Sequence, residues 1–338
     1  MNLATINSGV SYGNDNAGCG NTITNNIHTI NNNPIFAQQP DNAESQILKW
    51  ISPLELPDRH HGVRELRFPG VGNWILGAPE FKGWEDGSAH PTLFCDGDPG
   101  VGKTFIRYKR RCFGQFIYTI LLTGRIFSSL VIDTLRSQAR ERKFRVFYLY
   151  CDYLTYKERF AVDLIALLLK QALAGLGRIP EKVSRKFEGS EVPGSDRMRP
   201  LLPDIVDMLG TVLASFERVF ICIDALDEFP PLQRPDFLRS LAELTRLSET
   251  RLFLTGRPQI QHDKKYLGEG TQTISITTRE EEIKAYITHR LDQDQNSAEM
   301  NTELKAEIMN ILPHKVSGMY VGVVVSYAGD MSFADNHI

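Results

Sequence analysis

One segment limits the possible folds of this 338-residue chain more than any other, and it combines an apolar run with closely spaced glycines. Residues 91–95 (PTLFC) are typical of a buried strand, and Gly97, Gly100 and Gly102 follow it, with Lys103-Thr104 directly after. Glycines let the backbone wrap closely around an anion and turn successive N–H groups toward it. A helix after such a turn adds its positive N-terminal end. The segment therefore predicts a loop that binds a polyphosphate.

Two polar side chains complete this loop. Lys103 has the length and charge to reach the β- and γ-phosphates of a nucleotide, and the Thr104 hydroxyl is a ligand suited to Mg²⁺. The GxxxxGKT spacing, with a strand-like run before it, is specific to this chemistry. We therefore predict that Gly97, Gly100, Gly102, Lys103 and Thr104 bind a nucleotide and that Thr104 also binds the metal.

Acidic residues follow a second apolar run. Residues 219–223 (VFICI) are typical of a central strand, and Asp224 comes directly after them. A carboxylate at a strand tip can hold Mg²⁺, directly or through water. Asp227 and Glu228 lie just beyond, where one of them could polarise an attacking water molecule. We predict Asp224 as a metal ligand and Asp227 and Glu228 as the catalytic acids.

A cation follows a third apolar run. Residues 251–255 (RLFLT) are expected to form a strand, and Gly256-Arg257-Pro258 follows. Ligands of open α/β sheets bind at the carboxyl ends of the strands, which would bring Thr255 and Arg257 beside the phosphates. A positive charge there can sense the γ-phosphate.

Strand-like and helix-like segments alternate along the chain. This alternation predicts an α/β fold, a P-loop NTPase with a parallel sheet flanked by helices, followed by a small helical module. The expected strands are 91–95, 145–151, 219–223, 251–255 and 273–276, and the expected helices are 46–51, 160–176, 200–216, 237–247, 278–291 and 298–312.

In motif order the chain resembles the NACHT-type NTPases of filamentous fungi, signalling ATPases of the STAND class that are also described as nephrocystin 3-like N-terminal domain proteins. The resemblance lies in the phosphate loop, YLYCDY at 148–153, VFICIDALDEF at 219–229 and LFLTGRP at 252–258, and in linker pieces such as EFKGW at 80–84. It covers roughly residues 45–325. It favours ATP over GTP as ligand, together with Mg²⁺. The sequence has no convincing guanine-specific motif, and GTP stays open as an alternative. The resemblance also implies Arg257 as the nucleotide sensor.

Two segments depart from the pattern of these relatives. Gly256 stands where relatives tend to carry Ser, which removes one polar contact. Residues 105–125 separate Thr104 from the helix that relatives continue at once, and they carry five basic residues and no acid. Three explanations stay open: a genuine insertion, a basic arm for membrane or nucleic acid, or a translated unspliced intron, which the clean resumption at Ile126 favours.

The domain organisation follows from composition. Residues 1–44 hold eleven Asn and no Lys or Arg, and we expect a disordered tail because they cannot bury enough apolar surface. A helical linker at 45–90, the NTPase core at 91–277 with its insertion, and a helical module at 278–338 follow. Relatives continue beyond this module, so we expect a truncated or naturally short member.

The charge and hydropathy of the chain argue against nucleic-acid-binding, secreted and membrane-spanning proteins. The formal net charge of −3 argues against a nucleic-acid partner, and we expect neither a secretory signal nor a membrane span. The five cysteines lack metal-binding spacing, so we expect buried reduced thiols at Cys95, Cys151 and Cys222. A cytoplasmic protein with protein partners or self-association is the resulting expectation.

The predicted function is a nucleotide-operated signalling switch, and slow Mg²⁺-dependent hydrolysis is compatible with its residues. By resemblance, its biology is self-recognition, programmed cell death or immune-like signalling. The alternative is an inactive interaction scaffold or a truncated, mis-spliced product. A small-molecule kinase would need an acceptor pocket and a lid that the sequence does not identify.

Overall fold

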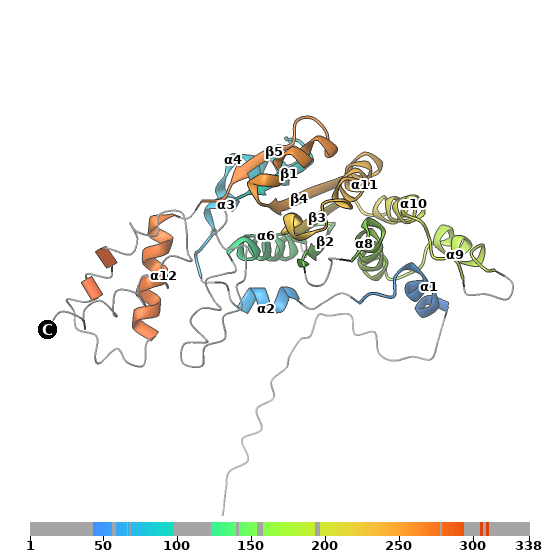
Figure 1. Cartoon of the computed structure of the whole chain (residues 1–338), viewed down its shortest axis with the longest axis horizontal. Helices are drawn as coiled ribbons and strands as arrows, with labels where there is room; N and C mark the ends of the chain where they lie inside the picture. Colours follow the sequence, from blue (N-terminus) through green and yellow to red (C-terminus); the bar gives the residue numbers. More distant parts are fainter. Residues whose placement is uncertain are drawn as a thin grey trace, which may run out of the picture. The chain divides into compact units, whose positions relative to one another are not determined.

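In the part of the chain that the structure describes, five parallel strands form the centre of the fold (Figure 1), and the first four in the chain coincide with apolar runs of the sequence. All five lie within one or two residues of the predicted ranges, which confirms those predictions. The strands are β1 Thr92–Asp96, β2 Phe144–Tyr150, β3 Arg218–Asp224, β4 Thr250–Gly256 and β5 Gln272–Ser275.

This computed structural model describes residues 43–55, 59–65, 67, 69–97, 123–139, 142–153, 158–192, 197–277, 279–293, 305–306 and 309–310. All of them belong to one unit that spans residues 40–338. The helices are α1 Ala43–Ile51, α2 Arg59–Glu65, α3 Trp74–Gly77, α4 Pro79–Asp86, α6 Thr123–Ala139, α8 Ala161–Leu176, α9 Glu181–Glu188, α10 Leu202–Leu213, α11 Arg234–Leu247 and α12 Glu280–Gln293, with 3₁₀ segments η2 Leu226–Glu228 and η3 Pro258–Tyr266.

The strand order is β2-β3-β4-β1-β5, so sequence neighbours are not always spatial neighbours. From β1 the chain passes to the far edge at β2, and from β4 it crosses β1 to reach β5. The connection after β1 therefore runs toward the β2 edge of the sheet, and the connection after β4 runs toward the β5 edge. In open α/β sheets a position where the connections diverge in this way opens a crevice outside the carboxyl ends of the strands, where ligands bind. Asp96 of β1 pairs with Gly256 of β4, and the glycine-rich segment begins just after Asp96.

Side chains of the central strands alternate between two hydrophobic layers, as the pleat requires. In β3, Val219, Ile221 and Ile223 pack with α8, α10 and α11, whereas Phe220 and Cys222 pack with α6 and the aromatic linker. Both layers exclude water, which explains why these strands are apolar throughout rather than alternating in polarity. Cys95, Cys151 and Cys222 are buried free thiols, as expected.

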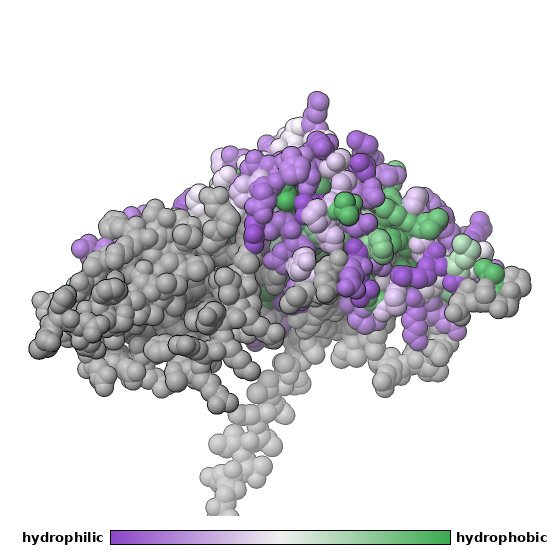
Figure 2. Space-filling view, viewed as in Figure 1, coloured by the Kyte–Doolittle hydropathy of each residue, from purple (hydrophilic) through white to green (hydrophobic). Residues whose placement is uncertain are grey.

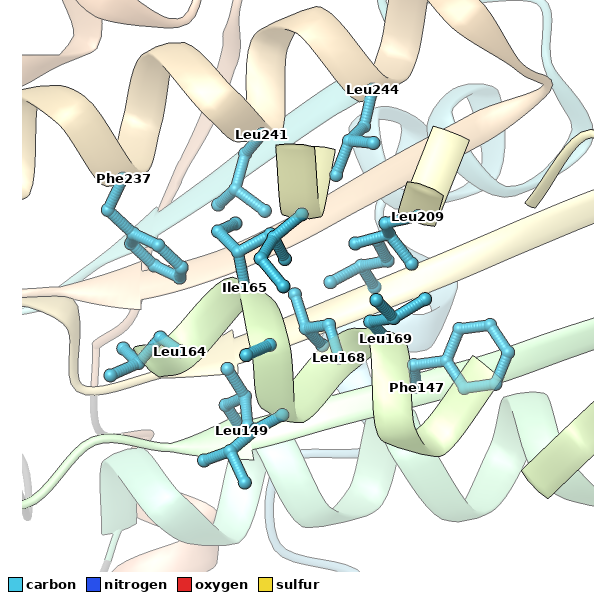
Figure 3. Close-up of a cluster of buried hydrophobic side chains, with 14 of the residues drawn as sticks. Phe147, Leu149, Leu164, Ile165, Leu168, Leu169, Leu209, Phe237, Leu241 and Leu244 are labelled. Atoms are coloured by element: carbon cyan, nitrogen blue, oxygen red, sulfur yellow. The ribbon is translucent and has the colours of Figure 1, made fainter. Parts of the chain in front are cut away.

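Helix α8 contributes a buried face to one layer (Figure 3). Leu164, Ile165, Leu168 and Leu169 recur at the three- and four-residue spacing of one helix face and are fully buried. Phe147 and Leu149 of β2, Leu209 of α10, and Phe237, Leu241 and Leu244 of α11 surround them. The helix ends at Gly177, whose φ of +71° lets its N–H bond to the carbonyl of Leu173.

Helices α2 and α9 are among the helices for which no range was expected from the sequence. They are seven and eight residues long and mostly charged, and each buries only two residues. Their stability comes from docking onto the rest of the fold, because helices of this length are marginal in isolation. Much of the helix predicted at 298–312 lies outside the described residues, as do residues 1–42 of the tail and Thr278, the expected N-cap of α12. The tail was expected to end at residue 44, but Ala43 and Glu44 already belong to α1.

The described surface is largely hydrophilic in the view of Figure 2, with hydrophobic residues interspersed. Among the helices of the described ranges, none combines the length and the apolar character that a membrane crossing requires.

Truncating the α8 core tests the packing. Ile165→Ala should lower the free energy of unfolding by about 2–5 kcal/mol, because it removes buried methyl groups and leaves a cavity. Leu232→Ala is the control, since Leu232 is 90 % exposed and its loss should change stability by less than about 0.5 kcal/mol. Urea denaturation followed by circular dichroism measures both, and equal effects would contradict the assigned core.

Candidate functional site

The structure describes only part of the predicted phosphate loop. Gly97 directly follows β1, whereas Gly100, Gly102, Lys103 and Thr104 lie outside the described residues, as does most of the segment 105–125. The chain is described again from Thr123, where helix α6 begins. Helix α6 therefore starts three residues before Ile126, at which the helix was expected to resume.

Asp224 is the polar centre of the site. It is the last residue of β3, and the alternation of the strand directs its side chain to the same layer as Phe220 and Cys222, which faces α6. The residue is 1 % exposed. Its Oδ1 accepts hydrogen bonds from Ser128 Oγ of α6 at 2.5 Å and from Thr255 Oγ1 of β4 at 2.8 Å. One carboxylate thus joins three elements of the fold.

Thr255 also fixes the backbone beyond Asp224. Its Oγ1 accepts the N–H of Ala225 at 2.9 Å while its proton goes to the carboxylate. Ala225 has φ +54° and is the only non-glycine residue with positive φ in the described part of the chain. This conformation costs about 1–3 kcal/mol and persists where surrounding contacts impose it. It turns the chain sharply into the 3₁₀ segment that carries the next two acids.

Asp227 and Arg257 meet beyond the ends of β3 and β4, and Glu228 lies next to Asp227 in η2. Asp227 Oδ1 accepts the backbone N–H of Arg257 at 3.2 Å, and its Oδ2 lies 3.0 Å from Arg257 Nε. Glu228 takes a different direction, and its Oε2 accepts the backbone N–H of Tyr153 at 3.3 Å. The two acids therefore have different environments although they are adjacent in sequence.

A second polar network flanks the site at the end of β2. Tyr150 is the register partner of Asp224, and burial, aided by the Asp224 charge, raises the pKa of its hydroxyl, which keeps it protonated. His60 of α2 lies between the Tyr150 hydroxyl, 2.8 Å from Nδ1, and Asp133 of α6, 2.9 Å from Nε2. Arg67 lies 3.0 Å from the other oxygen of Asp133. This network therefore joins the linker helix α2 to β2 and α6, next to Asp224, the candidate metal ligand.

Gly256 has a packing role that the sequence comparison with relatives did not indicate. A Cβ at this position would come within 2.6 Å of Ile260 Cδ1 and 3.2 Å of Phe94 Cζ. A serine here would require Ile260 to change its side-chain conformation. The glycine and the bulky Ile260 therefore belong together in this chain.

The donors present suit a hard cation bound jointly with phosphate. Within the described ranges, no group of three or more His, Cys, Asp and Glu side chains is placed to hold a metal. A single carboxylate, with a hydroxyl and phosphate oxygens, is the set that Mg²⁺ usually takes in nucleotide sites. Asp224 is the carboxylate that fits this description.

The family model of the nephrocystin 3 N-terminal domain matches residues 70–108 and 125–257, about half of the chain. The chain belongs to this family. The nephrocystin 3 N-terminal match includes β1 to β4, the phosphate-loop sequence, Asp224 and Arg257. It omits residues 109–124, which lie within the basic segment 105–125. The glycine-rich sequence after β1, the acid at the end of β3 and the parallel sheet together give this chain an α/β fold of the P-loop class.

Some solved structures resemble this chain distantly. The Orc1 protein of Aeropyrum pernix, solved with DNA, is 12 % identical at a TM-score of 0.39, over 86 % of this chain and 64 % of its own. Cdc6p of Pyrobaculum aerophilum is 14 % identical at 0.42, over 85 % and 66 %. The chain thus spans slightly less than two thirds of each, and at such TM-scores the likenesses assign no function. A comparison with curated proteins finds no match.

Sequence reasoning missed the role of Ser128. It lies in an apolar helical run, Ile126–Leu135, where a buried hydroxyl needs a partner, and that polarity was the available signal. Sequence reasoning also missed Arg234 and Asp263, which are distant from any recognised motif. The predicted residues Asp224, Asp227, Glu228 and Arg257 are brought to one edge of the sheet.

Thr255→Val tests the support of Asp224. The isosteric valine leaves the Ala225 N–H without its acceptor and removes one donor from the carboxylate, so unfolding free energy should fall by about 1–3 kcal/mol. Thr273→Val, on an exposed position of β5, is the matched control and should change it by less than about 0.5 kcal/mol. Urea denaturation measures both, and an unaffected Thr255→Val protein would refute this support.

Asp133→Asn tests the flanking network through pH. Burial acts to raise the pKa of Asp133, but the hydrogen bond and charge of His60 and the charges of Arg67 and Arg64 outweigh it, so the folded-state pKa lies below 3.8. The ionised carboxylate therefore stabilises the fold above the unfolded-state pKa, and this contribution disappears as pH falls through the folded-state pKa. Asp133→Asn should be less stable than wild type at pH 7, and the difference should shrink below about pH 4.

Denaturation curves between neutral and acidic pH measure this difference. Asp236→Asn provides the control, because Asp236 pairs with Arg239 on an exposed face of α11. Exposed pairs of this kind contribute little to stability. A wild-type advantage over Asp133→Asn that stays constant down to pH 3 would contradict the assigned ionisation.

Proposed function

We propose that this chain is a nucleotide-operated signalling switch of the NACHT/STAND type, with ATP and Mg²⁺ as its ligands. The observation that carries the proposal is Asp224, a buried carboxylate at the end of β3, held by Ser128 of α6 and Thr255 of β4. It lies two strands from the end of β1, where the glycine-rich sequence follows. Family membership supports the proposal, because the matched residues include both the glycine-rich sequence and Asp224.

Each predicted site residue has its own role in nucleotide binding or hydrolysis in this proposal. Gly97, Gly100, Gly102 and Lys103 hold the phosphates, and Thr104 and Asp224 would hold Mg²⁺. Mg²⁺, when bound, neutralises negative charge on the β- and γ-phosphates. Ser128 and Thr255 keep the Asp224 carboxylate oriented, because both hydroxyls donate hydrogen bonds to its Oδ1. The acids after β3 orient water for slow hydrolysis, and Arg257 contacts the γ-phosphate.

Contacts between the linker and α12 support a switch rather than a simple binding protein. Gly72 N donates to Glu282 Oε1 of α12 at 2.7 Å, and the Arg279 guanidinium lies 4.7 Å from the Trp74 ring centre. Trp74 in turn packs edge-on against Phe127 of α6, with ring centres 5.9 Å apart.

Phe127 directly precedes Ser128, which bonds Asp224. A change at the carboxylate is therefore connected to α12 by consecutive contacts. In this proposal the γ-phosphate biases the packing of α12, and protein partners or a second copy read the result. The switch would act in the cytoplasm, in self-recognition or cell-death signalling of the kind that the resemblance to fungal proteins implies.

A second candidate function is an interaction scaffold without productive nucleotide turnover, or the product of an unspliced message. Two observations favour it. Helix α6 begins at Thr123, so Thr123, Gly124 and Arg125 occupy the helical positions directly before Ile126, where relatives have the residues of GKT. The family match also breaks at 109–124. The basic segment would then have displaced Lys103 and Thr104 from the helix start.

Nucleotide binding separates the two candidates. The chain should bind a fluorescent ATP analogue with Mg²⁺, and Lys103→Ala should weaken binding at least about tenfold because it removes a charge-assisted phosphate contact. Lys143→Ala, an exposed lysine 3.2 Å from Glu217, is the charge-matched control and should leave the affinity unchanged. Fluorescence anisotropy gives the dissociation constants.

Removing residues 105–125 completes the test, because it joins Thr104 directly to Ile126. Binding by the full chain that depends on Lys103 supports the switch. Binding only after the deletion supports the mis-spliced product, and sequencing of the mature transcript then decides whether the segment is encoded. Absence of binding by both forms refutes the switch and leaves the scaffold.

A further inference from the structure

The carboxylate of Asp96 lies directly before the glycine-rich segment and is not one of the predicted site residues. Asp96 is the last residue of β1, Gly97 follows it, and the aspartate is 2 % exposed. The alternation of the strand directs its side chain to the same face of the sheet as Phe94, opposite to the layer that contains α6. A buried carboxylate needs hydrogen bonds from its surroundings, and the origin of those bonds shows what it holds together.

Two separate segments of the chain donate hydrogen bonds to this carboxylate. Ser275 Oγ, at the end of β5, donates to Asp96 Oδ1 at 2.7 Å. Gln261 Nε2, in η3, donates to Asp96 Oδ2. Each oxygen therefore has a donor from a different segment, and both segments belong to the part of the chain between β4 and α12.

The backbone at Asp96 strengthens its connection to β5. Asp96 and Ser275 are register partners in the parallel pair of β1 and β5, and the Asp96 carbonyl accepts the N–H of Ile276 at 2.5 Å. Ile276 is 2 % exposed and belongs to the hydrophobic layer that contains Phe127. Helix α12 begins at Glu280, four residues after Ile276. A displacement of Asp96 would therefore move the chain that leads into α12.

A lysine of η3 places a positive charge near this carboxylate. Lys264 Nζ lies 4.6 Å from the centre of the Phe94 ring, on the same face of β1 as Asp96. Burial lowers the pKa of Lys264, and the charge of Asp96 acts in the opposite direction, toward the protonated form. The ammonium group in turn offsets part of the cost of burying the carboxylate. Charge as well as hydrogen bonds thus holds η3 against the end of β1.

We propose that Asp96 is a positioning residue that couples the phosphate loop to α12: its carboxylate holds η3 and the end of β5 against the residue before Gly97, so that a triphosphate bound to the loop changes the position of α12. This inference rests on the proposed nucleotide function and adds a second series of contacts to α12. The first series begins at Asp224 and passes through Phe127. The second begins at the phosphate loop itself, whose backbone N–H groups contact the phosphates in sites of this kind.

Thermodynamic reciprocity supplies the test, because α12 must influence ATP affinity if ATP influences α12. Glu282→Ala removes the hydrogen bond between α12 and the N–H of Gly72 and should change the ATP dissociation constant about fivefold. Glu281→Ala, at an exposed neighbouring position of α12, removes the same charge and should leave the constant unchanged. Fluorescence anisotropy of the full chain with Mg²⁺ and a fluorescent ATP analogue measures both.

Breaking the contact between Asp96 and Ser275 should uncouple α12 from the nucleotide. Asp96→Ala and Ser275→Ala remove the same hydrogen bond from its two ends. In either background, Glu282→Ala should change the ATP dissociation constant by less than about twofold. Ser275→Thr keeps a hydroxyl group and should keep the fivefold effect. A contact that only stabilises the fold would shift both affinities of each pair equally and leave their ratio unchanged.

Each outcome decides for or against the inference. Circular dichroism establishes folding, and if Asp96→Ala is unfolded, Ser275→Ala decides, because the serine is exposed and its truncation leaves no cavity. A fivefold effect of Glu282→Ala that persists in the Ser275→Ala background overturns the inference and leaves the nucleotide function standing. Loss of the effect in Ser275→Thr overturns it too, since the hydroxyl is then not the group that carries the coupling.

Two further results separate this inference from the proposed function. If Glu282→Ala has no effect in the otherwise unchanged chain, α12 is not linked to the nucleotide, and the inference fails although binding remains. If the full chain does not bind ATP in a Lys103-dependent manner, the proposed function fails and the inference fails with it.

Discussion

Burial of the Asp224 carboxylate is the constraint around which the carboxyl edge of this sheet is organised. A charge taken out of water must be compensated by hydrogen bonds, and here the hydroxyls of Ser128 and Thr255 supply them. Those hydroxyls come from α6 and β4, so the helix, the two strands and the turn at Ala225 are fixed together. The apolar layers hold the sheet, but this contact determines how the helix and strand ends meet.

Two other buried polar side chains also join separate elements near this edge of the sheet. Arg234 joins the segments after β3 and β4, and His60 joins the linker to α6 and β2. Each of these side chains is buried and contacts two or more elements. The loops at this edge are anchored by the buried side chains of Leu226, Phe229 and Ile260, and the polar contacts add direction to that hydrophobic burial. Such contacts are directional, which suits a region where sub-ångström placement matters.

The sequence was sufficient for the sheet and for the acids at its edge. Fully apolar runs identify buried parallel strands, and the residues that follow them must lie at one edge, which is why Asp224 and Arg257 could be predicted to be neighbours. The difference between the environments of Asp227 and Glu228 could not be predicted. It depends on Arg257, thirty residues away in sequence, and on a turn whose positive φ falls on an alanine, a residue that gives no signal for it.

Short charged helices and polar pairs between distant residues could not be predicted from the sequence either. Helix α2 has the segment RHHGVRE, whose pattern does not reveal that His60 is buried. Arg234 and Asp263 are ordinary charged residues until the fold brings them within 2.9 Å. Tertiary context overrides local preference at these positions. The basic segment 105–125, by contrast, is conspicuous in sequence and lies mostly outside the described residues.

The left-handed conformation of Ala225 has a consequence for how this chain can evolve. Glycine would relieve the local strain at that position but would enlarge the freedom of the unfolded chain, so the two effects on stability oppose each other. A β-branched side chain would add strain to a turn whose N–H is already committed to Thr255. Because Ala225 is also buried, this position suits residues that both tolerate positive φ and fit a small space, so a steric limit on one residue outside the charged groups helps to preserve the order of the carboxyl edge.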